Sequence, residues 1–233
     1  RINSDHYLAQ ILKSNQKAFL SSSRTIDAYI EACKSINSDH YVASVLKQVI
    51  SDRSITDAQM GSLLDITKSI NSDHYVTTVL TQIMDNRDLT TDNVTKIIGL
   101  SKQINSDHYK TTVLKKVINE KNMPAEAYDA FLSTLSDVNS DHYTTEIVNT
   151  LLDSKLEANA QSLYSLLDIV KNNVSSDHYS ATIFKRLANQ NLSEDQLIVA
   201  LNATSNINSD HYMSEVLLAS AGKVSRSSER VKT

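Results

Sequence analysis

The 233-residue chain has only three glycines, one proline and no tryptophan. Glycine and proline make up roughly 12% of an average protein, and β-sandwich turns and glycine-rich phosphate loops depend on them. Their scarcity argues against both structures and favours an all-α chain. The single cysteine, Cys33, excludes an intrachain disulfide and a zinc cluster built from cysteines.

The chain also has no excess of positive charge, because 23 Lys and Arg face 27 Asp and Glu. A protein that binds nucleic acid needs cations for the phosphate backbone, so we expect no nucleic-acid partner. No apolar run approaches the roughly 18 residues of a membrane helix, and no signal peptide precedes the first motif. Because the chain opens inside that motif and without Met, we expect it to be one region of a longer polypeptide.

A tetrapeptide, Ser-Asp-His-Tyr, occurs seven times and dominates the sequence. Its histidines follow one another at intervals of 34, 34, 34, 34, 36 and 33 residues, and every histidine of the chain lies in it. The copies lie at 4–7, 38–41, 72–75, 106–109, 140–143, 176–179 and 209–212. A period of about 34 residues is that of a helical hairpin with two short turns.

The apolar pattern within each repeat predicts two helices. After Tyr41, apolar residues follow four, five, eight and nine positions later, as on one face of an α-helix. A second run, from Met60 to Ile70, has the same period. We therefore predict an all-α fold, a right- or left-handed α-solenoid of about six and a half tandem helical hairpins.

Capping chemistry marks the helix starts. Thr56 begins a capping box for the second helix of its repeat. For the first helix we choose Asn37 as the N-cap, because Ile36 and Tyr41 can then form a hydrophobic staple. The other candidate cap, Ser38, would place a polar residue at the staple position in several copies.

Every repeat has a small residue two positions after the motif tyrosine, which predicts close approach of neighbouring repeats. These residues are Ala9, Ala43, Thr77, Thr111, Thr145, Ala181 and Ser214. We expect the motif Asp and His to bond across the repeat boundary, to free N–H groups or to each other, as a structural ladder. The motif positions chosen for this role are Asn37, Ser38, Asp39, His40, Tyr41, Asp73, His74, Tyr75, Asp107, His108, Tyr109, Asp141, His142, Tyr143, Asp177, His178 and Tyr179.

The motif does not predict an active site. Consecutive residues of a helix point about 100° apart, so Ser, Asp and His cannot bond in series as a catalytic triad must. Equivalent histidines of stacked repeats should lie roughly 10 Å apart, too far to share one metal ion. We predict no catalytic residue, metal ligand or cofactor. Tyr41 and its equivalents are predicted to be core residues, and Cys33 a buried, unreactive thiol.

The two ends depart from the repeat pattern. Asn15 and Gln16 stand where the second repeat has apolar residues, so the first helix should be short or exposed there and serve as an N-terminal cap. The predicted organisation is one solenoid domain over residues 1–221, followed by a flexible basic tail or linker over 222–233.

Tandem helix pairs of this length resemble the α-solenoid superfamily. The Trp, Leu-Gly and Ala-x-x-x-Phe positions of tetratricopeptide repeats are absent from residues 72–105, and the array is more similar to short HEAT-like repeats. An Asn-Ser-Asp-x-Tyr opening followed by Val-Leu also resembles helical repeats of bacterial multidomain proteins, which accompany membrane or signalling regions. The resemblance implies an architecture and no catalytic residues.

The expected function is a non-enzymatic repeat scaffold that binds a protein or peptide along an extended surface. Candidate partner contacts are Lys110, Lys115 and Lys116, which we expect to be exposed because other residues replace them in the next repeat. One alternative is a structural spacer or sensor between further domains. Another is a metal- or pH-responsive array, because seven histidines can change the net charge near neutral pH.

Overall fold

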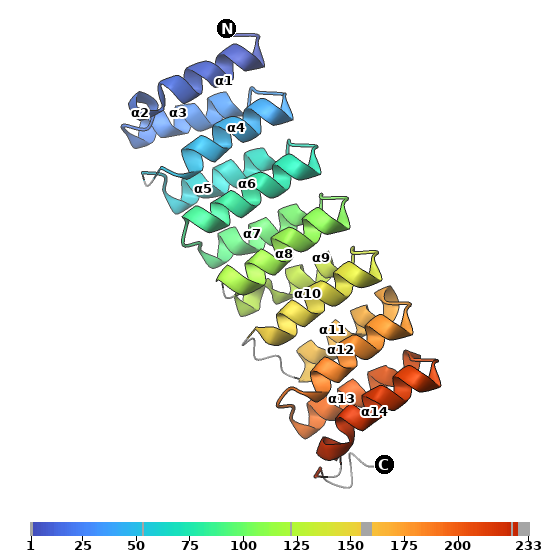
Figure 1. Ribbon diagram of the computed structural model, residues 1–233. Coiled ribbons are helices and arrows are strands. Elements are labelled where there is room, and N and C mark those ends of the chain that lie inside the picture. The colour runs from blue at the N-terminus through green and yellow to red at the C-terminus, as the bar shows by residue number, and fades with distance from the viewer. Residues whose placement is uncertain (1, 53, 122, 155–159, 225, 228–233) are drawn as a thin grey trace. The chain divides into compact units, whose positions relative to one another are not determined.

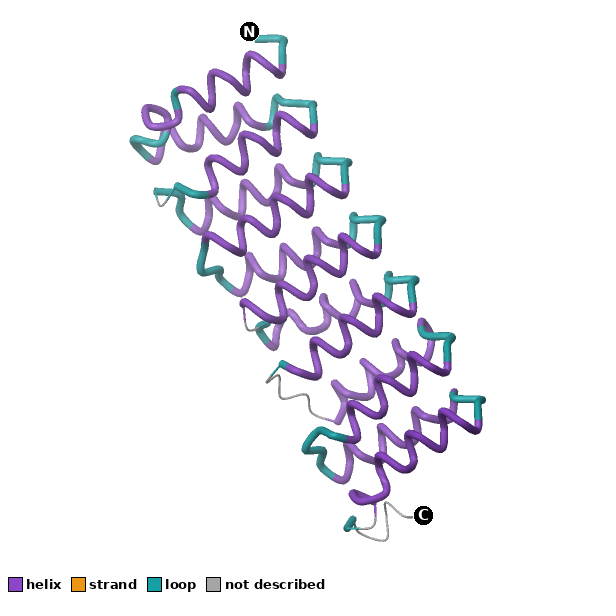
Figure 2. Tube along the Cα trace, viewed as in Figure 1, coloured by secondary structure: helices purple, strands orange, loops and turns teal. Residues whose placement is uncertain are grey.

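The computed structural model describes residues 2–52, 54–121, 123–154, 160–224 and 226–227. Throughout these residues the regular elements are helices, and no strand occurs among them (Figure 2). The chain divides into two compact units, Arg1–Phe131 and Leu132–Thr233.

The first unit builds two layers of helices. One layer stacks α1, α4, α6 and α8 in sequence order, and the other stacks α3, α5 and α7 (Figure 1). The elements are α1 (Asp5–Ser14), α2 (Gln16–Phe19), α3 (Ser23–Cys33), α4 (Asp39–Ile50), α5 (Asp57–Thr67), α6 (Asp73–Asn86), α7 (Thr91–Ser101), α8 (Asp107–Lys121) and the short 3-10 helix η1 (Ala125–Ala127).

The second unit repeats this plan, with α10, α12 and α14 stacked in one layer and α11 against α13 in the other. Its elements are α10 (Asp141–Asp153), α11 (Ala160–Asn173), α12 (Asp177–Ala188), α13 (Glu194–Ala203), the 3-10 helix η2 (Thr204–Asn206) and α14 (Asp210–Val224). Helix α9 (Tyr128–Leu135) begins in the first unit and ends in the second. Helices that begin in the motif are called A helices below, and the others B helices. The predicted all-α solenoid is confirmed.

The core lies between the two layers of each unit. The apolar stripe predicted after Tyr41 is fully buried in α4, from Val45 to Ile50, and Leu63 and Leu64 of the adjacent helix α5 are fully buried as well. Burying one such side chain contributes about 1.5–3 kcal/mol relative to leaving it exposed. The small residues two positions after the tyrosine are also buried from Ala9 to Ala181, and within each unit successive A helices pack together.

The predicted N-cap of the A helices is wrong by one residue. Helix α4 begins at Asp39, and its N-cap is Ser38 and not Asn37. The Ser38 carbonyl accepts the first helical hydrogen bond, from Val42 N at 2.9 Å. Figure 2 shows the same short loop before each A helix. A contact with the preceding repeat sets this register, as described below, and local staple chemistry does not.

The burial pattern also corrects the position of the tyrosines. Tyr41 is only half-buried, and the residue after it starts the buried stripe. In the five interior copies that position is buried even where it is polar, and its occupants there are Val42, Val76, Lys110, Thr144 and Ser180. The expectation that Lys110 is exposed was therefore wrong, because a polar residue stands at a core position in that repeat.

The ends of the chain differ from the interior repeats. As expected, the first A helix is short: α1 ends at Ser14, and the separate four-residue helix α2 follows. Helix α14 ends at Val224, so residues 222–224 of the expected tail are helical. Residues 225 and 228–233 of that segment lie outside the described residues. Among the helices described, none is both long and apolar enough to cross a membrane.

Candidate functional site

The motif aspartates bind the start of the next A helix in the chain. Asp5 of α1 accepts hydrogen bonds through Oδ2 from the backbone N–H groups of Asn37, at 3.0 Å, and Ser38, at 2.8 Å. Asp39 binds Asn71 and Ser72 in the same way, at 3.1 and 2.8 Å. A carboxylate at these free N–H groups also interacts favourably with the positive end of the helix dipole.

The contact recurs within both units. Asp73 accepts from Ser106 N, Asp141 from Ser176 N and Asp177 from Ser209 N, each at 2.8 Å. Where Ser175 replaces the motif asparagine, its hydroxyl also bonds to Asp141, at 3.1 Å. These bonds cross the repeat boundary, as the ladder hypothesis requires. Their contribution to the stability of the packed repeats stays a prediction.

The motif histidines are exposed and lie beside tyrosines. His40 packs edge-on against its neighbour Tyr41 and against Tyr75 of the next repeat, with ring centroids 5.1 and 5.8 Å apart. His40 Nδ1 and the Tyr75 hydroxyl also form a hydrogen bond of 3.1 Å. Across the other repeat boundaries within the two units, the His–Tyr separations are between 5.5 and 6.1 Å. Such aromatic edge contacts supplement stacking.

The remaining motif residues occupy the same position in their helices. His74, Asp107, His108, Tyr109, His142, Tyr143, His178 and Tyr179 all lie in the first turn of an A helix. In the part of the chain that the structure describes, no three His, Cys, Asp or Glu side chains gather closely enough to hold a metal ion. The motif residues are thus arranged along each unit at repeat boundaries, and they do not converge on one cavity.

The three candidate lysines of α8 differ in exposure. Lys110 is only 3% exposed, and Lys115 is half-buried. The Lys116 ammonium lies 2.5 Å from a carboxylate oxygen of Asp85 in α6. Two of the three positions therefore take part in packing or pairing within the unit, and partner contact at these residues stays a prediction.

Cys33 is completely buried near the end of α3. Burial raises the pKa of its thiol to about 12, and the thiolate is the reactive form of cysteine. The predicted buried position is confirmed, and Cys33 has the environment of a packing residue.

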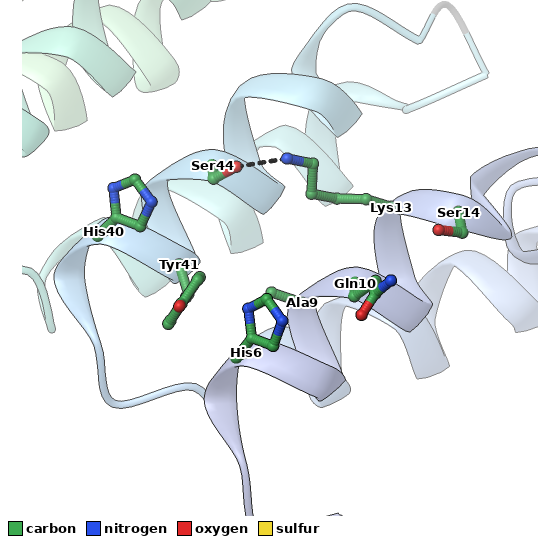
Figure 3. A pocket seen from close by; sticks show the side chains of 8 residues that line it. All are labelled: His6, Ala9, Gln10, Lys13, Ser14, His40, Tyr41 and Ser44. Atoms are coloured by element: carbon green, nitrogen blue, oxygen red, sulfur yellow. Dashed lines mark hydrogen bonds between the residues drawn. The ribbon is translucent and has the colours of Figure 1, made fainter.

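One surface pocket lies between α1 and α4 and has a volume of about 330 Å³ (Figure 3). Figure 3 shows the two motif histidines and Tyr41 at one end, with Lys13 reaching from α1 to Ser44 of α4 at the other. The Lys13 ammonium donates to the Ser44 hydroxyl at 2.7 Å. The lining residues are His6, Ala9, Gln10, Lys13, Ser14, His40, Tyr41 and Ser44. His6, His40 and Tyr41 of this pocket are motif residues that form the contacts between repeats.

A second pocket, of about 210 Å³, lies between the B helices α11 and α13. Helix α11 supplies Tyr164, whose large side chain is 56% exposed, together with Asp168. The lining residues are Tyr164, Leu167, Asp168, Lys171, Val199, Asn202 and Ala203. The pocket thus combines an exposed aromatic ring, apolar walls and charged groups, a mixture typical of ligand sites.

The equivalent place between α5 and α7 in the first unit is filled by a lysine. Lys96 of α7 donates from Nζ to the carbonyl oxygen of Gly61 at 3.0 Å and to Asp65 Oδ2 at 2.9 Å. The hydrogen bond from Lys96 lowers the pKa of the Asp65 carboxyl. Aligning the buried apolar residues of the B helices places Tyr164 at Gly61, Asp168 at Asp65 and Val199 at Lys96. The second unit therefore keeps the carboxylate but lacks the lysine.

This pocket was not predicted, because its residues lie outside the recurring motif. The signal that was present lies at variable positions of the B helices, where Tyr164 stands at the position of Gly61 and Val199 at that of Lys96. Comparisons of the chain with family models, with curated proteins and with solved structures found no match.

Proposed function

We propose that the protein is a non-enzymatic repeat scaffold that binds a protein or peptide. The observation that carries the proposal is the pocket between α11 and α13, with the exposed ring of Tyr164 at its rim. An aromatic side chain offers a large contact area at low entropic cost, which is why tyrosine is enriched where proteins bind one another.

The recurring residues and the variable residues of the repeats have different contacts, which supports this proposal. Asp39 and its equivalents bind the next A helix, and the histidines lie against the next tyrosine. Through these contacts, the motif residues hold neighbouring repeats together. The residues that vary, such as Tyr164 and Val199, are then free to determine what a repeat binds without disturbing the stack.

The test is selection from a random peptide display library on the immobilised chain, followed by affinity measurements. We expect peptides whose binding is lost in Tyr164→Ala and kept in Tyr7→Ala, a matched change of another exposed tyrosine, 62% exposed. If no peptide is enriched above the uncoated surface, the binding function is wrong. If the enriched peptides bind Tyr164→Ala as well as the original chain, the pocket is not the site.

A further inference from the structure

The pocket between α11 and α13 lacks an ammonium group that its counterpart between α5 and α7 contains. In the counterpart, Asp65 pairs with two lysines: Lys68, one turn along the same helix, at 3.3 Å, and Lys96 of the next B helix, at 2.9 Å. Asp168 keeps the first of these neighbours, because Lys171 follows it at the same spacing. The place of the second lysine is taken by Val199.

Asp168 has the capacity for such a partner. It accepts a hydrogen bond from the Asn172 side chain at 3.3 Å through Oδ2, and a carboxylate has about four acceptor sites on its two oxygens. The example of Asp65 shows that this arrangement accepts a second ammonium while the lysine one turn away is present. Lys171 at the pocket therefore does not oppose a second cation.

The walls suit the rest of a lysine side chain. Leu167, Val199 and Ala203 offer apolar surface to a methylene stem, and long cationic side chains cover such surface while the charged end stays at a polar group. The five side-chain atoms of lysine need on the order of 150 Å³ at the volume of one water each, and the pocket has about 210 Å³. Tyr164 stands where Gly61 lies in the counterpart, and its ring can attract an ammonium.

Resting on the proposed function, we infer that this pocket binds the side chain of a lysine supplied by the partner. The ammonium pairs with Asp168, and the stem lies against Leu167 and Val199. The partner thus takes the position that Lys96 occupies between α5 and α7. Specificity within the array then arises because this pair of B helices combines the Asp168 carboxylate with the ring of Tyr164 and apolar walls.

The test is an NMR titration of the whole chain with two small probes, Nα-acetyl-lysine amide and Nα-acetyl-norleucine amide. The second probe keeps an apolar stem and lacks the ammonium. We expect the lysine probe to shift amide signals of α11 and α13 and to bind about tenfold more tightly than the norleucine probe, equivalent to about 1.4 kcal/mol. Asp168→Asn should remove that difference.

Val199→Lys provides a variant that restores the missing side chain. It should fill the pocket as Lys96 does in the first unit and abolish binding of the lysine probe, whereas the matched control Val199→Leu should keep the preference for lysine. Equal binding of the two probes to the original chain, or a preference that survives Asp168→Asn, overturns the inference. If library peptides bind at Tyr164 but contain no basic residue, the inference fails while the proposed binding function stands.

Discussion

A carboxylate from the preceding repeat, and not the serine side chain, completes the start of most A helices. Ser38 occupies the N-cap position, yet its side chain makes no capping hydrogen bond. Asp5 instead binds the N–H groups of Asn37 and Ser38. Local chemistry favoured Asn37 as the N-cap, and that prediction was wrong because the carboxylate that binds this helix start lies 33 residues away from Ser38.

The thiol of Cys33 gives a prediction at the same scale. Since burial raises its pKa to about 12, we expect a disulfide reagent at pH 8 to label the native chain only as fast as the first unit opens. The labelling rate in native buffer, followed by absorbance, should rise sharply when denaturant unfolds the chain. Equal rates in both solutions would show that the thiol is exposed.

At the scale of the element, the A and B helices begin by different means. Helix α5 begins with a local capping box, in which Thr56 accepts from Gln59 N at 3.2 Å and Gln59 accepts from Thr56 N at 3.1 Å. The box was predicted from the sequence and is present. Gln59 also donates to Asp27 of α3 at 2.9 Å, so this cap too contacts the previous repeat.

This difference predicts unequal effects of two similar substitutions. Thr56→Ala should lower the free energy of unfolding by about 1 kcal/mol, the usual cost of losing a side-chain N-cap. Ser38→Ala should change it by only a few tenths of a kcal/mol, in the range of neutral surface changes. Urea unfolding followed by circular dichroism measures both values. A larger loss for Ser38→Ala than for Thr56→Ala contradicts the assignment of the two caps.

Some features of the elements were predictable and others were not. The 34-residue period and the apolar stripes predicted the helices and their buried faces, because both are patterns along one helix. The buried position of Lys110 and the half-exposed tyrosines were not predicted. The residue after each tyrosine lies three and four positions before the buried apolar pair and shares its face of the helix, and a polar residue there hides this in the sequence. The pocket at Tyr164 was not predicted either. It is formed by side chains of two neighbouring B helices, at positions whose residues differ from repeat to repeat.

At the scale of the whole molecule, each helix packs mainly on the next helix of the same layer within its unit. In the first unit α4 packs on α6 and α6 on α8, and in the second α10 packs on α12 and α12 on α14. In arrays of this kind stability is close to a sum of repeat and nearest-neighbour contributions. Local damage should therefore weaken neighbouring helices before distant ones.

Hydrogen exchange tests this expectation in Asp39→Ala, which removes the bonds to Asn71 and Ser72. We expect the amides of α6 to exchange faster than in the original chain, while those of α12 keep their protection. Mass spectrometry of proteolytic fragments separates the two helices. Uniformly faster exchange in both helices would instead indicate one cooperative block.

The most direct test of the account is the free energy of unfolding of Asp39→Ala, with Ser38→Ala as its control. If the motif holds repeats together, loss of two hydrogen bonds to a charged acceptor should cost about 1–3 kcal/mol, because the carboxylate is partly exposed. The control should stay close to the original chain. An Asp39→Ala protein as stable as the original would contradict the structural role of the motif. The seven motif aspartates would then require another explanation.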